Sequence, residues 1–154
     1  MVAEITAPKS MDKVLGYNFS KVTAGNASVI LTSSMSVDQN GETNFERALA
    51  DMEMRIPSGI RTKKTVFHCS LNPHPDDRLT TEQLQDIARE YMEKMGYGKQ
   101  PYIVFKHNDI AREHIHIVSL RVDSYGKKLP YKFEARRSKR ITDELERKYG
   151  LIPS

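Results

Sequence analysis

Two apolar runs in the second half of the chain, residues 102–107 and 114–122, restrict the possible folds more than any other feature. Each run has the length and residue content of a buried β-strand. Only the six residues 108–113 connect them, and two parallel strands would need a longer crossover. The sequence therefore predicts an antiparallel strand pair in the core of a sheet.

Predicted strands and helices alternate along the rest of the chain. Thr80 with Gln83, and Thr43 with Glu46, have the spacing of a capping box at a helix start. Gly96 is placed to end the helix that Thr80 begins. The expected strands cover 2–6, 27–32 and 63–70, and the expected helices cover 10–20, 43–55, 80–95 and 131–149. This order predicts an α+β fold with helices over a central antiparallel β-sheet, and no linker divides the chain into two domains.

Composition excludes several classes of protein. No apolar run approaches the roughly 18 residues that a membrane span needs, and the first ten residues lack the apolar core of a secretory signal. The single cysteine, Cys69, excludes a disulfide scaffold and a multi-cysteine zinc site. We therefore expect a cytoplasmic protein without membrane insertion, in which Cys69 is a small buried strand residue.

The basic residues are concentrated in one segment. The chain carries 24 Lys and Arg against 20 Asp and Glu, and the whole surplus lies in residues 126–140. Such a segment favours contact with nucleic-acid phosphates, although a solvated helix end gives the same pattern. Residues 126–140 follow directly after the predicted strand 114–122, so we expect them to lie close to the histidines of that strand. Arg61, Lys63 and Lys64 form a second, weaker basic cluster. The candidate DNA-binding residues are Lys127, Lys128, Lys132, Arg136, Arg137, Lys139 and Arg140.

Three of the five histidines lie on the predicted strand pair. His114 and His116 are two residues apart and therefore point to the same face of their strand. His107 ends the preceding strand, where an antiparallel pairing places it opposite or diagonal to His114. Three imidazoles on one face can bind Zn, Mn, Ni, Co or Fe and leave positions open for substrate. The alternative is a chance pair of strand histidines, but polar rings in an apolar strand pair are costly unless they bind something.

Two further residues are candidates for the same site. Asp109 follows His107 by two residues and is predicted to accept the second ring N–H of a ligating histidine. The alternative for Asp109 is a side chain that only stabilises the turn. His68, near the end of a predicted strand, is a candidate neighbour of the cluster.

These residues carry a resemblance to a known family. The segment HNDIAREHIHIV resembles the histidine motif of the mobilisation relaxases, members of the HUH endonuclease superfamily. The family form is His-x-Asp, four variable residues and His-x-His, which His107, Asp109, His114 and His116 match. The segments LGYN, HCSLNPHPDD, VDSYGKKL and LERKYGL are also similar to the family, as is the helix LTTEQLQDIAREYMEKMGYG, so the resemblance covers nearly the whole chain.

The resemblance implies a fold and a reaction. The family fold is a central antiparallel sheet flanked by helices, a palm like a permuted RNA-recognition domain. In the family reaction a tyrosine attacks the nick site of an origin of transfer, stays joined to the 5′ phosphate and leaves a free 3′-OH. The reverse reaction rejoins the strand during conjugative mobilisation. Relaxases carry this tyrosine upstream of the histidines, and Tyr17 stands in that position.

The resemblance also implies partners and a cofactor. The substrate is single-stranded origin DNA, and accessory mobilisation proteins and a coupling protein are further expected partners. The cofactor held by His107, His114 and His116 is a divalent metal ion, Mn²⁺ or Mg²⁺, with Zn²⁺, Ni²⁺ and Co²⁺ as alternatives. Relaxases of this type are usually longer, so residues 1–154 are expected to be a single nuclease domain at the N-terminal part of a longer protein, or a short member of the family.

The chemistry explains why these residue types occur together. A phenol has a pKa near 10, so Tyr17 needs a base to take its proton and a cation to withdraw charge from the phosphate. Asp109 is the catalytic candidate for that base, and a metal-oriented histidine is the alternative. Two other functions fit the histidines. One is a metal-dependent phosphodiester hydrolase without a covalent intermediate, and the other is a non-catalytic DNA-binding module with a structural metal.

Overall fold

The computed structural model describes residues 1–108 and 112–154. Within these residues the chain forms one five-stranded antiparallel sheet and four helices, which is the expected α+β fold. No helix in the described part of the chain is both long and apolar enough to cross a bilayer. The elements are β1 (Val2–Thr6), α1 (Met11–Thr23), β2 (Ala27–Ser33), α2 (Phe45–Met54), β3 (Val66–Asn72), α3 (Thr81–Met95), β4 (Tyr102–His107), β5 (His114–Leu120) and α4 (Glu134–Tyr149).

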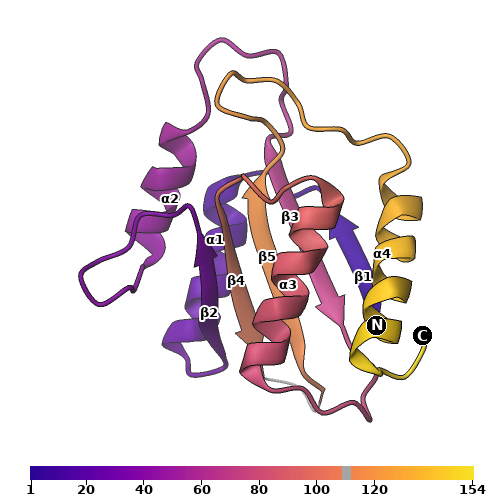
Figure 1. The fold of residues 1–154 in the computed structure, drawn as a ribbon. Coiled ribbons are helices and arrows are strands. Elements are labelled where there is room, and N and C mark those ends of the chain that lie inside the picture. Colours follow the sequence, from indigo (N-terminus) through magenta and orange to yellow (C-terminus); the bar gives the residue numbers. More distant parts are fainter. Residues whose placement is uncertain (109–111) are drawn as a thin grey trace.

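Strand β5 is the middle strand of the sheet, whose order is β1-β3-β5-β4-β2 (Figure 1). It pairs antiparallel with β4 on one side and β3 on the other. The predicted antiparallel pair is therefore confirmed. Its connection joins two strands that are adjacent both in sequence and in the sheet.

Helices cover both faces of the sheet (Figure 1). Val118 and Phe105 pack against α1 and α2 on one face, and Ile117 and Val104 pack against α3 and α4 on the other. Successive strand residues point to opposite faces, so a strand that is covered on both sides needs apolar residues at nearly every position. This explains the continuous apolar runs of β4 and β5.

The predicted capping box of α3 is confirmed. The Thr80 side chain accepts a hydrogen bond from the Gln83 backbone N–H at 3.1 Å, and the Gln83 side chain accepts one from the Thr80 N–H at 2.8 Å. Gly96 ends the helix in the left-handed conformation with φ 93°.

The capping box predicted for Thr43 and Glu46 is wrong. Asn44 is the N-cap of α2, and its side chain accepts the Arg47 N–H at 2.8 Å. Asparagine is among the best N-cap residues, so the neighbouring Asn44 takes the position from Thr43.

Helix α4 begins three residues later than predicted. Leu129 donates a backbone hydrogen bond to Arg121 at 2.8 Å, which holds the preceding segment against β5. Phe133 then turns the chain into the helix with φ 56°. Lys132 therefore precedes the helix and shares no helix face with Arg136. Strand β3 also starts later than predicted, so Lys63 and Lys64 lie in a loop.

The Thr80 cap makes a measurable contribution to stability. The substitution Thr80→Ala is expected to lower the free energy of unfolding by about 1 kcal/mol, because the Gln83 N–H loses its acceptor. Urea denaturation measures this difference. Thr81→Ala, one residue into the helix, is the matched control and should leave the stability nearly unchanged. An equal loss in both variants would contradict the cap assignment.

Candidate functional site

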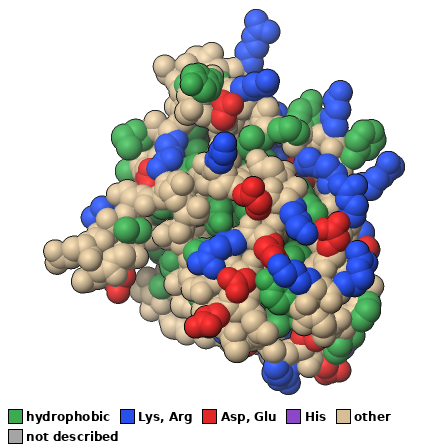
Figure 2. All heavy atoms as spheres, in the orientation of Figure 1, with side chains coloured by type: hydrophobic (Ala, Val, Ile, Leu, Met, Phe, Trp, Pro, Cys, Tyr) green, Lys and Arg blue, Asp and Glu red, His purple; other side chains and the backbone are tan. Residues whose placement is uncertain are grey.

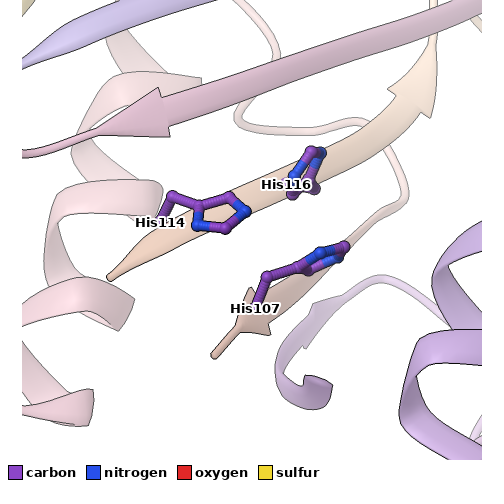
Figure 3. A group of neighbouring side chains, drawn as sticks. All are labelled: His107, His114 and His116. Atoms are coloured by element: carbon purple, nitrogen blue, oxygen red, sulfur yellow. The ribbon is translucent and has the colours of Figure 1, made fainter. Parts of the chain in front are cut away.

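The pairing of β4 with β5 brings three histidines together (Figure 3). His107 is directly opposite His114, and His116 follows two residues later on the same face. The ring centroids of His107 and His116 are 4.1 Å apart, and each lies 5.2 Å from that of His114. One nitrogen from each ring lies within 4.8 Å of the other two. The predicted convergence of the three imidazoles is confirmed.

The cluster has the properties of a cation site. His107 and His114 are buried, with 1% and 8% of their surfaces exposed. The buried Nδ1 of His114 has no hydrogen-bond partner among the described residues. A buried polar nitrogen without a partner is costly, and a bound cation would remove that cost. Three nitrogen donors suit a divalent transition metal and leave coordination positions for a substrate.

Asn18 positions His107 from helix α1. Its side chain is fully buried, and its Nδ2 donates a hydrogen bond to the Val14 carbonyl at 2.8 Å. That bond fixes the amide so that Oδ1 faces His107 Nε2 at 2.7 Å. Because Oδ1 can only accept, Nε2 of His107 carries the hydrogen. Asn18 was not predicted as a site residue, although a polar side chain next to the apolar face of the predicted helix was a visible signal.

His68 supports His116 from strand β3. Its Nε2 lies 3.0 Å from His116 Nδ1, and its Nδ1 lies 2.7 Å from the Thr6 hydroxyl. Burial lowers the pKa of His68, so its ring is neutral and has one nitrogen that accepts a hydrogen bond. His68 therefore contacts the cluster directly, as expected of a candidate neighbour.

Tyr17 lies beside the cluster on helix α1. The residue is 53% exposed, and the centroid of its ring is 6.2 Å from that of His107. Tyr17 lines an open groove together with His68 and His116. Asp109, the predicted catalytic partner, lies outside the described residues.

The structure distinguishes Tyr17 from the other six tyrosines. Tyr125 and Tyr131 are also exposed, but they lie beyond the end of β5 that is remote from the histidines.

Burial raises the pKa of Tyr97 and Tyr149 to about 12, and it also raises that of Tyr91. Tyr102 is 4% exposed. Tyr17 is thus the exposed phenol on the histidine face of the sheet.

Cys69 is not an alternative nucleophile. Its side chain is fully buried among apolar residues of β3, on the face that α3 and α4 cover. Burial raises the pKa of its thiol to about 12, so the reactive thiolate does not form at neutral pH. The prediction of a small buried strand residue is confirmed.

Three lysines that were not predicted as site residues lie near Tyr17. Lys9 and Lys13 line the same groove, and Lys21 Nζ lies 5.6 Å from the centroid of the Tyr17 ring. Lys13, Tyr17 and Lys21 are spaced four residues apart, which places them on one face of α1. This spacing was visible in the sequence.

The basic segment 126–140 does not lie beside the histidines, and that expectation is wrong. Leu120 lies six positions after His114 on β5, a distance of about 20 Å. The basic segment begins only after that far end of the strand. Its helix, α4, then covers the opposite face of the sheet from the histidines (Figure 1). Because β5 runs from the histidine end of the sheet to the opposite end, the basic residues that follow it lie away from the cluster.

The members of this segment differ in their surroundings. Lys139 forms an ion pair with Asp143 at 2.9 Å, and Arg137 donates to the Pro130 carbonyl at 3.3 Å. The exposed members lie in the loop after β5 or on the outer side of α4. They are Lys127, Lys132, Arg136, Lys139 and Arg140.

Comparison with known protein families gives one finding. The family model described as "Relaxase: MobA/VirD2-like, nuclease domain" matches residues 17–151. The matched range contains the tyrosine, the three histidines and the basic segment. A comparison with curated proteins found no match.

A bound cation is expected to stabilise the folded chain. With Mn²⁺ at about 100 times its dissociation constant, the free energy of unfolding should rise by about 2.7 kcal/mol. His114→Ala should lose this increment, because one of three ligands is removed. Thermal unfolding with and without Mn²⁺ provides the measurement. His74→Ala, in the loop after β3, is the matched control, and an equal loss there would show that the histidine cluster is not the binding site.

Proposed function

The chain belongs to the relaxase family of MobA/VirD2-like nuclease domains, and from that membership we propose that it nicks and rejoins one DNA strand at an origin of transfer through Tyr17. Membership of this family supports DNA nicking in mobilisation as the activity. The main support for Tyr17 as the nucleophile is its exposed phenol. The centroid of its ring is 6.2 Å from that of His107, one of the three histidines of the cluster.

In the proposed reaction Tyr17 is the nucleophile. Its phenolic oxygen attacks the phosphorus of the scissile phosphodiester, and a bond to the 5′ phosphate forms. The bond between phosphorus and the 3′ oxygen breaks, and that oxygen takes a proton to become the free 3′-OH. One phosphodiester replaces another, so the reverse attack by a 3′-OH can rejoin the strand without ATP. For the base that takes the phenolic proton we propose Asp109, with a histidine of the cluster as the alternative.

We assign His107, His114 and His116 as the residues that hold the metal ion. Mn²⁺ or Mg²⁺ is the proposed cofactor, and three imidazoles also fit Zn²⁺, Ni²⁺ or Co²⁺. A divalent cation bound there would withdraw charge from the phosphate oxygens and orient the phosphate for in-line attack. Asn18 and His68 hold the rings of His107 and His116 in their hydrogen-bonded orientations.

Lys9, Lys13 and Lys21 place positive charge beside the proposed nucleophile. Lys9 and Lys13 line the groove that leads from Tyr17 to His116, where they can contact the phosphates of an entering strand. The Lys21 ammonium lies 5.6 Å from the centroid of the Tyr17 ring and adds positive charge beside the proposed nucleophile. These contacts support single-stranded DNA as the substrate, because the open groove gives Tyr17 access to a flexible strand.

A denaturing gel tests the covalent step. The protein is incubated with Mn²⁺ and overlapping single-stranded oligonucleotides from the replicon that encodes it. We expect a DNA–protein adduct that Tyr17→Phe abolishes and Tyr149→Phe, on the face of the sheet opposite the cluster, leaves intact. Cleavage without an adduct would indicate a hydrolase, and binding without cleavage would indicate a non-catalytic module. An adduct that survives Tyr17→Phe would contradict the assignment of the nucleophile.

The hydrogen bond from Asn18 should set metal affinity without supplying a ligand. Asn18→Ala is expected to weaken Mn²⁺ binding by roughly 10–100-fold, the usual effect of losing such a supporting partner. Asn18→Asp keeps an oxygen that accepts from His107 Nε2, and should restore most of the affinity. Isothermal titration measures all three proteins. If the alanine and aspartate variants lose the same affinity, the effect comes from packing and not from the hydrogen bond.

A further inference from the structure

Three large aromatic rings are exposed where the chain leaves the far end of β5. Tyr125, Tyr131 and Phe133 are 89%, 52% and 68% exposed. Single exposed apolar residues are ordinary, but a group of exposed rings within nine residues is not. Basic side chains lie between them. The aromatic–basic surface consists of Tyr125, Lys127, Lys128, Tyr131, Lys132, Phe133 and Arg136.

The cations of this surface are held against its rings. Lys128 Nζ lies 4.1 Å from the centroid of the Tyr131 ring, and Arg136 Cζ lies 5.1 Å from that of Phe133. Within residues 1–108 and 112–154, no lysine or arginine of the aromatic–basic surface forms an ion pair. Their charge therefore remains available to an anionic partner.

The one acidic residue of the segment does not neutralise this charge. Both carboxylate oxygens of Glu134 accept hydrogen bonds from the guanidinium of Arg121, at 2.8 and 3.3 Å. Arg121 is buried at the end of β5, with 7% of its surface exposed. Glu134 thus serves as the counter-ion of a buried arginine, and the surface outside it stays positive.

The backbone at Phe133 is strained, although its ring is exposed. Its φ of 56° and ψ of 31° are left-handed, a conformation that costs a residue with a side chain roughly 1–2 kcal/mol. Glycine would adopt it without this cost. Phe133 therefore exposes an apolar ring to solvent at a position where the backbone conformation favours glycine. Strain of this kind is concentrated at functional positions.

The tertiary structure adds a second basic loop to the same end of the sheet. The Arg121 backbone N–H donates to the Thr65 carbonyl at 2.7 Å, and a Cβ on Gly126 would lie 2.5 Å from Ile60. Residues 57–65 therefore pack against residues 121–126 (Figure 1). Figure 2 shows Lys and Arg side chains at this end of the molecule, interspersed with hydrophobic ones. The exposed cations that the second loop adds are Arg61, Lys63 and Lys64.

From these observations we propose that the aromatic–basic surface is a second binding site for single-stranded DNA. Cations contact the phosphates, and exposed rings stack on unpaired bases, which is the combination that single-strand-binding surfaces use. In a duplex the bases are already stacked on each other, so exposed rings would gain little there. The identity of the nucleic acid as DNA rests on the proposed function.

The position of the surface fits a strand that also reaches the histidines. Strand β5 spans about 20 Å from His114 to Leu120, and the surface lies beyond that far end. This distance corresponds to about six nucleotides at the 3.4 Å rise per nucleotide of a DNA strand. After the cut at Tyr17, the part of the strand that ends in the free 3′-OH would thus stay bound at a second position. Its 3′-OH would remain close enough for the reverse attack that rejoins the strand.

Binding of fluorescein-labelled oligothymidylate in EDTA tests this site without metal or strand cleavage. The double substitution Tyr131→Ala with Phe133→Ala is expected to weaken binding by about tenfold or more, because stacking on each base contributes about 1–3 kcal/mol. Arg136→Ala should reduce the slope of log affinity against log salt by about 0.7, the loss of one phosphate contact. Arg147→Ala, farther along the same helix, is the matched control and should bind like the wild type.

Two results would overturn the assignment. Unchanged oligothymidylate affinity in the double variant would exclude the aromatic–basic surface from single-strand binding. A loss of affinity for duplex DNA as large as the loss for the single strand would show that the rings do not stack on unpaired bases. Adduct formation by Tyr17 is measured separately with Mn²⁺, so absence of the adduct refutes the proposed function while the oligothymidylate result still decides this surface.

Discussion

The register between β4 and β5 is the constraint on which the rest of the site depends. His107 pairs with His114, and both rings point to the face that α1 and α2 cover. A slip of one residue would turn one strand's side chains to the other face and separate the three imidazoles. The apolar residues that alternate with the histidines oppose such a slip. Val118 and Ile117 each fit a different layer of helices, so the same packing that builds the core also aligns the three imidazoles.

The site is completed by elements that are distant in the sequence. Asn18 comes from α1 and lies 89 residues before His107, to which it hydrogen-bonds. His68 comes from β3 and links His116 to Thr6 at the end of β1. Buried polar rings need partners, and these two contacts supply them from the same layers that enclose the apolar core. The geometry of the histidine cluster and the stability of the fold therefore depend on the same packing.

Positive charge is divided between two places with different surroundings. Lys9 and Lys13 line the groove beside Tyr17, and the aromatic–basic surface lies beyond the far end of β5. The central strand determines this division, because it runs from the histidine end of the sheet to the opposite end. The formal net charge of +4 describes neither place, since acidic residues elsewhere offset most of the basic ones.

The local features of the fold could be predicted from the order of the residues alone. The apolar runs predicted the central antiparallel pair, the period of two placed His114 and His116 on one face, and Thr80 with Gln83 predicted a capping box that the structure contains. Local interactions decide these features, since strand alternation and capping depend on residues a few positions apart. The spacing of Lys13, Tyr17 and Lys21 also lay within reach of such reasoning.

The folded structure alone shows which distant segments meet. It placed Asn18 against His107, His68 against His116, and residues 57–65 against residues 121–126, and it moved the basic helix to the face opposite the histidines. Such contacts depend on the order of strands in the sheet and on which helix covers which face. Those choices follow from the fit of whole layers, which neighbouring residues in the sequence do not encode.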